Sequence, residues 1–187
     1  MRWFITSQSM ALMASSITFP FYLLFIHNIG SSFSSFGIAY GVFTLSSALF
    51  HKGVGAAADK IGGKSLLYFY SFGMAFLFLL IPEIHQLWQV YLFQFVLGGL
   101  GSIQKTCEKT LLAGLTGQED RGRTIGHYHF WTSLYAAGAV MACGVLIDYF
   151  TVSYIFYLGS VFYFISGMAL AKMKVSLSSE TVEDIGL

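Results

Sequence analysis

The stretch GAAADKIGGKSLL, residues 55–67, is a short charged run between two long apolar segments of the chain. A membrane-spanning helix has to end where its backbone and its charged side chains can meet water. The glycines of the run permit a tight reversal of the backbone, and its charges suit the membrane surface: Gly55, Gly62 and Gly63, with Asp59, Lys60 and Lys64. The run therefore predicts a loop between two spanning helices.

The composition of the chain indicates a membrane protein. Its 187 residues are 56% hydrophobic and only 10% charged, whereas soluble domains carry about 25% charged residues. A net charge of +1, with no basic patch beyond the loops, excludes nucleic acid as an expected partner and leaves membrane lipid as the expected surroundings. Cys107 and Cys143 fall in or at the end of apolar segments, which favours buried thiols over a disulfide framework.

Six segments are long enough to cross a hydrocarbon core about 30 Å thick, which takes roughly 20 helical residues. We therefore expect an all-α membrane protein with six transmembrane helices, at Phe4 to Ile26, Phe36 to about Ala57, Ser65 to Ile81, Leu87 to about Cys107, Ile125 to Ile147 and Tyr154 to Ala171.

The basic residues agree on one orientation. If six helices alternate, all ten lie on the same side: Arg2, Lys52, Lys60, Lys64, Lys105, Lys109, Arg121, Arg123, Lys172 and Lys174. The opposite connections, residues 27–35, 82–86 and 148–153, contain no Lys or Arg. Because cytoplasmic loops carry the excess of basic residues, we expect a multi-pass protein of the cytoplasmic (plasma) membrane with both termini in the cytoplasm.

Pairs of small residues suggest where helices approach closely. Three pairs stand out, Gly37 with Gly41, Gly98 with Gly101, and Gly138 with Gly144. Small residues allow close backbone contact in lipid, although glycine is also simply common in membrane helices.

The run at residues 55–67 resembles the loop between helices 2 and 3 of the major facilitator superfamily of transporters, G-x-L-A-D-R-x-G-R-K-x-x-L. The matching residues are Gly55, Ala58, Asp59, Gly62, Lys64 and Leu67, and Lys60 keeps the charge of the family's Arg. Ala57 replaces the usual Leu and Gly63 replaces an Arg. Residues 99–101, Gly-Leu-Gly, are similar to the family's R-x-x-x-G-x-G helix, but Phe95 stands in place of its Arg. Residues 118–123 are similar to the acidic-then-Arg-Gly loop before helix 5.

The resemblance implies one six-helix half of a transporter that normally has twelve helices. Such a half consists of helices 1–3 and 4–6 as a 3+3 inverted repeat. On this basis residues 1–171 form the transmembrane domain, and residues 172–187 form a cytoplasmic tail similar to the start of a central linker. A homodimer or a second six-helix half would complete the path for a small-molecule substrate of unknown identity.

Helices 1 and 4 contribute to the central cavity in the family, and this implies a substrate cavity containing Gln8, Ser15, Gln94 and Gln104. Trp131, on the fifth segment, is added as a further cavity candidate. An amide in the middle of a membrane helix prefers water or a partner to lipid, which favours Gln94 most strongly. The competing interpretation is that Gln94 hydrogen-bonds a neighbouring helix and binds nothing.

Charges near the cytoplasmic ends suggest a gate. Lys105 and Glu108 are three residues apart on one helix and are expected to pair. Together with the motif loop (Gly55, Asp59, Lys60, Gly62 and Lys64), Arg121 and Arg123 they form ion pairs that differ between two access states, or they only set the topology. His127, about one turn inside the membrane, is a candidate proton relay or an ordinary hydrated histidine.

The sequence predicts no catalytic residues, no metal and no cofactor, and therefore no enzyme, because hydrolase, protease and phosphate-binding motifs are missing. No carboxylate is expected at the middle of the membrane, so the sequence offers no buried Asp or Glu for proton coupling. We expect a half-size transporter that works by alternating access. The alternatives are a non-transporting scaffold or partner subunit, and a truncated N-terminal half of a twelve-helix transporter.

Overall fold

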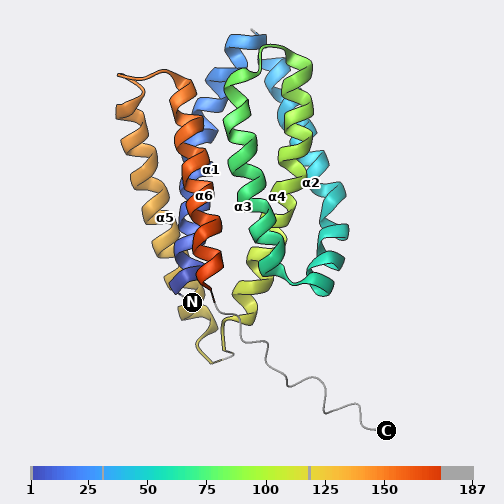
Figure 1. The fold of residues 1–187 in the computed structure, drawn as a ribbon, viewed down its shortest axis with the longest axis vertical. Helices are drawn as coiled ribbons and strands as arrows, with labels where there is room; N and C mark the ends of the chain where they lie inside the picture. Colours follow the sequence, from blue (N-terminus) through green and yellow to red (C-terminus); the bar gives the residue numbers. More distant parts are fainter. Residues whose placement is uncertain (1, 31, 118, 174–187) are drawn as a thin grey trace.

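The computed structural model describes residues 2–30, 32–117 and 119–173, which form six α-helices and one short 3₁₀ helix (Figure 1). The elements are α1 (Arg2–Gly30), α2 (Phe33–Ile61), α3 (Gly63–Leu80), η1 (Ile81–Glu83), α4 (Leu87–Gly114), α5 (Arg121–Leu146) and α6 (Val152–Lys172). The predicted tail falls almost wholly on residues 174–187, outside the described residues.

The all-helical fold is confirmed, and each predicted segment coincides with one helix. Most helices are longer than predicted because polar residues extend their ends. Ser32 precedes α2 and its hydroxyl accepts a hydrogen bond from the Ser35 N–H at 3.2 Å. Gln86 and Gln89 form a capping box at the start of α4. Gly62 alone separates α2 from α3, with a φ of 84° that favours glycine.

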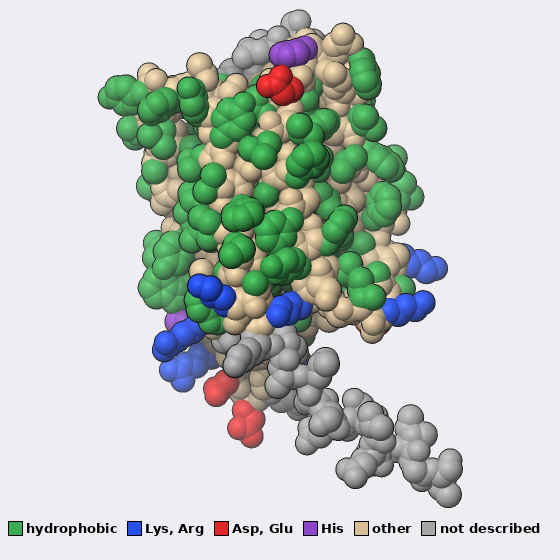
Figure 2. All heavy atoms as spheres, in the orientation of Figure 1, with side chains coloured by type: hydrophobic (Ala, Val, Ile, Leu, Met, Phe, Trp, Pro, Cys, Tyr) green, Lys and Arg blue, Asp and Glu red, His purple; other side chains and the backbone are tan. Residues whose placement is uncertain are grey.

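The helices run antiparallel to their neighbours in the chain, so the connections alternate between the two ends of the bundle (Figure 1). The N-terminus and the α2–α3 and α4–α5 connections lie at one end, which we call the basic end. The visible Lys and Arg side chains gather there, and the upper end of the bundle shows none of them (Figure 2).

The packing has a regular pattern. Helix α2 packs mainly on α4, and α5 packs mainly on α1. Helix α6 packs on α1 and α3, and α3 also packs on α4. The α2–α4 crossing is so close that a Cβ built on Gly98 would lie 2.3 Å from the Phe43 carbonyl oxygen. Helices α2 and α5 therefore lie at the two flanks of the bundle (Figure 1).

Three buried serines join the central helices. The Ser166 hydroxyl of α6 lies 3.0 Å from that of Ser7 on α1 and 3.2 Å from that of Ser71 on α3. Interhelical hydrogen bonds of this kind hold membrane helices together where water is absent. This serine cluster fixes α1, α3 and α6 against one another.

By length and composition, four helices in the described part of the chain are suited to cross a membrane: α2, α3 with η1, α5 and α6. Helix α4 carries polar side chains among its apolar ones, and Gln94, Ser102 and Gln104 are buried.

Candidate functional site

A cavity of about 320 Å³ lies among the helices. Its walls come from α1, α2, α3, η1, α4 and α6, and no described residue of α5 lines it. Eight aromatic side chains make up much of the wall: Phe19, Tyr22, Phe36, Tyr40, Phe43, Tyr70, Phe78 and Tyr163. The cavity is thus largely apolar, as ligand sites usually are.

Helix α4 supplies the strongest polar groups of the wall. Its lining residues recur every three or four positions: Gln94, Leu97, Gly101, Gln104, Lys105 and Glu108. Such spacing places side chains on one face of an α-helix. Helix α4 therefore presents a stripe of amide and charged groups to the cavity, which explains its lower apolar content.

A chain of hydrogen bonds, which we call the glutamate cluster, joins Gln8, Gln104, Glu108 and Tyr128. Gln104 Nε2 donates to Gln8 Oε1 at 2.6 Å and to Glu108 Oε2 at 3.2 Å, and the Tyr128 hydroxyl donates to Glu108 Oε1. Gln8 lies six residues beyond Arg2, about 9 Å along α1 at about 1.5 Å per residue. The cluster thus lies inside the bundle and links α1, α4 and α5 near the basic end.

Glu108 is partly buried and has no basic partner. Within the described ranges, no Lys, Arg or His nitrogen lies in ion-pair distance of its carboxylate, and both recorded donors are neutral. Lys105, one turn away on α4, is exposed. This corrects the expected Lys105–Glu108 pair: Glu108 faces α5 and the cavity, where Tyr128 and Gln104 reach it.

Two polar atoms belonging to cavity-lining residues are buried without a hydrogen-bond partner in the described structure, Gln104 Oε1 and the Tyr22 hydroxyl. A carboxylate only accepts hydrogen bonds, so the Gln104 atom that faces Glu108 is the NH₂ group. The amide oxygen of Gln104 is therefore left as an acceptor. Buried polar groups without partners are costly, and a ligand or water in the cavity can satisfy them.

The predicted cavity residues lie in three different settings. Gln94 and Ser15 line the cavity together with Gln104. Gln94 makes no hydrogen bond to any described residue, and the Ser15 hydroxyl donates to Leu12 O on its own helix at 3.0 Å. Gln8 is buried behind Gln104 and does not line the cavity. Trp131 is also outside it, stacked on Tyr135.

The motif loop is held by a contact that the sequence did not predict. Lys64 Nζ donates to the Met173 carbonyl at 2.6 Å, at the C-terminal end of α6. A cation is favourable there because carbonyl groups at a helix end carry partial negative charge. Asp59 and Lys60 are exposed, and Gly55 lies inside α2 with open space around it.

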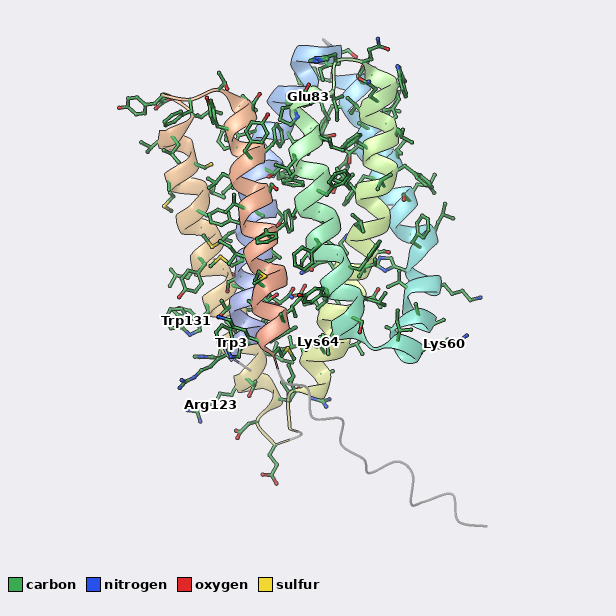
Figure 3. All side chains as sticks on the ribbon, viewed as in Figure 1. Trp3, Lys60, Lys64, Glu83, Arg123 and Trp131 are labelled. Carbon is green, nitrogen blue, oxygen red and sulfur yellow. The ribbon has the colours of Figure 1, made fainter. Side chains whose placement is uncertain are left out.

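The proposed gate residues are not joined in this conformation. Arg121 and Arg123 are exposed at the start of α5, and neither they nor Asp59 make an ion pair with any described residue. His127 is exposed and lies edge-on to Trp131, with ring centroids 6.2 Å apart. Figure 3 places Trp131, Arg123, Lys64 and Lys60 toward the basic end and Glu83 at the opposite end.

Sequence reasoning missed Glu108 as a cavity residue, along with the aromatic wall. The signal for Glu108 was present, since residues 94, 101, 104 and 108 share one helical face. Its assignment to a surface pair with Lys105 hid that signal. The aromatic wall had no comparable signal, because aromatic residues are frequent throughout this chain.

Comparisons with known proteins agree with the fold and the motif loop. The sequence model of the Major Facilitator Superfamily matches residues 4–183. The chain is also similar to an "Uncharacterized MFS-type transporter", YitZ of Bacillus subtilis strain 168, with 46% identity over 159 residues. That match covers 85% of this chain and 97% of the relative. The chain belongs to the major facilitator superfamily.

Proposed function

We propose that this chain is a half-size transporter that moves a small solute across the cytoplasmic membrane by alternating access, with the path completed by a second six-helix half. The observation that carries the proposal is the cavity between α1 and α4, which combines aromatic walls with a stripe of polar groups. A buried polar stripe is costly in a membrane helix and is usually kept for a function.

In this proposal all six helices span the membrane and the basic end faces the cytoplasm. The gathering of Lys and Arg at one end supports the orientation (Figure 2). Gln94 and Gln104 of α4 line the cavity and are buried, so the neighbouring helices shield these amides from lipid. The transmembrane domain would then comprise residues 1–171.

The packing pattern supports a 3+3 repeat. If α1, α2 and α3 exchange places with α4, α5 and α6, the α2–α4 contact becomes α5–α1, and the α1–α6 contact becomes α4–α3. The α3–α6 contact is unchanged by the exchange. These are the principal helix contacts of the described chain, so the set maps onto itself, as two related halves require.

Helices α2 and α5 are the proposed contact surfaces for the second half. A Cβ built on Gly37, Gly41, Gly138 or Gly144 would have nothing within 4 Å. Large apolar side chains beside them are exposed, including Leu45 and Met141.

The unpaired charges at the basic end suit a gate that forms in another state. Asp59, Arg121 and Arg123 are exposed and free to pair when the two halves rock against each other. Rigid-body rocking around a fixed site is how such repeats alternate access.

The mass of the particle in nanodiscs tests the assembly. We expect a protein mass of two 20.7 kDa chains, or of one chain with a different six-helix partner when the particle is isolated from native membranes. A strict monomer under both conditions would contradict a path enclosed by two halves.

A non-transporting scaffold or partner subunit is the second candidate. Phe95, which stands where the family pattern has an Arg, supports it, because it packs on Phe50 and carries no charge. Asp59→Asn and Gln94→Ala separate the two candidates, since both changes abolish transport in a transporter but leave partner binding intact in a scaffold.

A further inference from the structure

We infer that the cavity binds a protonated amine with an aromatic or apolar body, and that Glu108 and Gln104 hold its ammonium group. This inference rests on the proposed function, because it names the substrate class of the same cavity.

Glu108 indicates that the ligand is positively charged. Glu108 lines the cavity, and among the described residues its carboxylate receives hydrogen bonds only from the neutral groups of Tyr128 and Gln104. A carboxylate in a site of low dielectric constant is stabilised strongly by a cation at close range. A ligand cation would supply the charge that the described residues do not.

Gln104 indicates that the nitrogen of the ligand carries N–H groups, because the amide oxygen of Gln104 can only accept a hydrogen bond. Its Oε1 is buried and has no partner in the described structure, and Gln104 is one of the residues that line the cavity, so a small turn of the amide would bring this oxygen to a ligand there. Glu108 lies one turn further along the same face of α4. An ammonium group has three N–H donors, so it can donate to the carboxylate and to this amide oxygen together, which a quaternary ammonium cannot.

The body of the ligand follows from the rest of the wall. Tyr22, Tyr70, Phe78 and Tyr163 line the cavity on the α1, α3 and α6 sides. Their rings suit a flat apolar body, and aromatic faces also attract cations.

Lys105 is the one other charged residue in the described wall. Its side chain is exposed, whereas Glu108 is partly buried and bonded within the bundle. A charge that water screens acts weakly on the cavity, so Glu108 sets the preference.

Calorimetric titration of the full chain in nanodiscs with three matched probes tests the inference. The probes are 1-naphthylmethylamine, which is a cation at pH 7, 1-naphthylmethanol, which is neutral, and 1-naphthoate, which is an anion. We expect the amine to bind about tenfold or more tightly than the alcohol, and the naphthoate to bind least. Equal binding of amine and alcohol, stronger binding of naphthoate, or no binding of the amine would overturn the inference.

Three variants locate the effect. Glu108→Gln keeps the shape and one of the two acceptor oxygens while it removes the charge, and it is expected to lower amine affinity about tenfold while leaving alcohol affinity unchanged. Glu108→Asp keeps the charge and is expected to keep the preference for the amine, which guards against a folding defect in the first variant. Glu83→Gln removes an exposed carboxylate at the opposite end of the bundle and is expected to bind as the wild type does (Figure 3). Equal losses in the Glu83 and Glu108 variants would assign the effect to overall charge and overturn the site.

This binding test is independent of transport. If the cavity opens to both sides of the membrane and the amine does not bind, the transporter proposal stands and the substrate class is wrong. If the amine binds and the cavity opens to one side only, the site stands and the chain is a binding subunit.

Discussion

Helix α4 buries ten of its residues, including Gln94 and Gln104, whereas the next helix, α5, buries only Tyr128, Thr132 and Cys143. Yet α5 is apolar enough to qualify as a membrane span and α4 is not. The helix that is suited by composition to span a membrane is thus the less buried of the two. Lipid accepts the exposed apolar side chains of α5, whereas the protein interior has to accommodate polar groups such as Gln104 of α4.

The glycines of the two helices differ in the same way. Gly98 on α4 is closed against the backbone of α2, but Gly138 and Gly144 on α5 face open space. Closely spaced glycines thus lie in a helix–helix contact on α4, whereas on α5 they lie on a surface that no other helix of the described chain covers. This uncovered surface of α5 is the part of the fold that a second half is proposed to cover.

The largest effect is expected from Gly98→Ala. The added Cβ would lie 2.3 Å from the Phe43 carbonyl oxygen and 2.9 Å from Ser46 Cβ, so α2 and α4 have to separate. Overpacking lowers the free energy of unfolding by about 1–3 kcal/mol. We expect a loss near the upper end of this range, because the backbone of α2 or α4 has to move. Thermal denaturation in detergent would measure it. Gly138→Ala is the matched control and is expected to be neutral or to stabilise by up to about 1 kcal/mol; equal losses in both variants would refute the contrast between α4 and α5.

A smaller loss is expected from Tyr128→Phe. The Tyr128 hydroxyl of α5 donates a hydrogen bond to Glu108 on α4. Removing the hydroxyl takes one donor from a carboxylate that has no basic partner among the described residues. The expected cost is about 1–2 kcal/mol of stability. Tyr135→Phe is the control, because Tyr135 is exposed and its hydroxyl bonds to no described residue. An unchanged unfolding midpoint in Tyr128→Phe would show that α5 is held by apolar packing alone.

Gly138→Leu is expected to leave the fold of the half intact and to weaken its pairing with a second half. The new side chain has room within the chain itself but obstructs a close helix contact from outside. We expect association to weaken about tenfold, which corresponds to about 1.4 kcal/mol. Sedimentation in detergent measures the association, and a wild-type dimer fraction would exclude this face of α5 from the interface.

Much of the fold was accessible from sequence because apolar length and charge distribution are local properties. The predicted segments coincide with the helices, and the gathering of basic residues at one end appears in Figure 2. The lengths were underestimated where polar residues extend a helix past its apolar part, as Ser34 and Ser35 do at the start of α2.

The candidate site was only partly accessible, for a physical reason. The resemblance implied that helices 1 and 4 contribute to the cavity, and Gln94 and Gln104 of α4 line the cavity of the structure. Residue spacing tells which side chains share a helical face but not which neighbouring helix that face meets. Glu108 was therefore expected to pair with Lys105, whereas it is the Tyr128 hydroxyl of α5 that donates to it. Trp131 was misplaced for the same reason, because α5 turns no residue toward the cavity.

We propose that the cavity lined by Gln94 opens to both sides of the membrane in turn. Gln94→Cys, treated with a membrane-impermeant maleimide in right-side-out and inside-out vesicles, tests it without knowledge of the substrate. Cys107 and Cys143 are buried, so the parent protein supplies the background. We predict labelling of residue 94 from both sides in the assembled protein. Labelling from one side only would contradict alternating access and favour a scaffold or binding subunit.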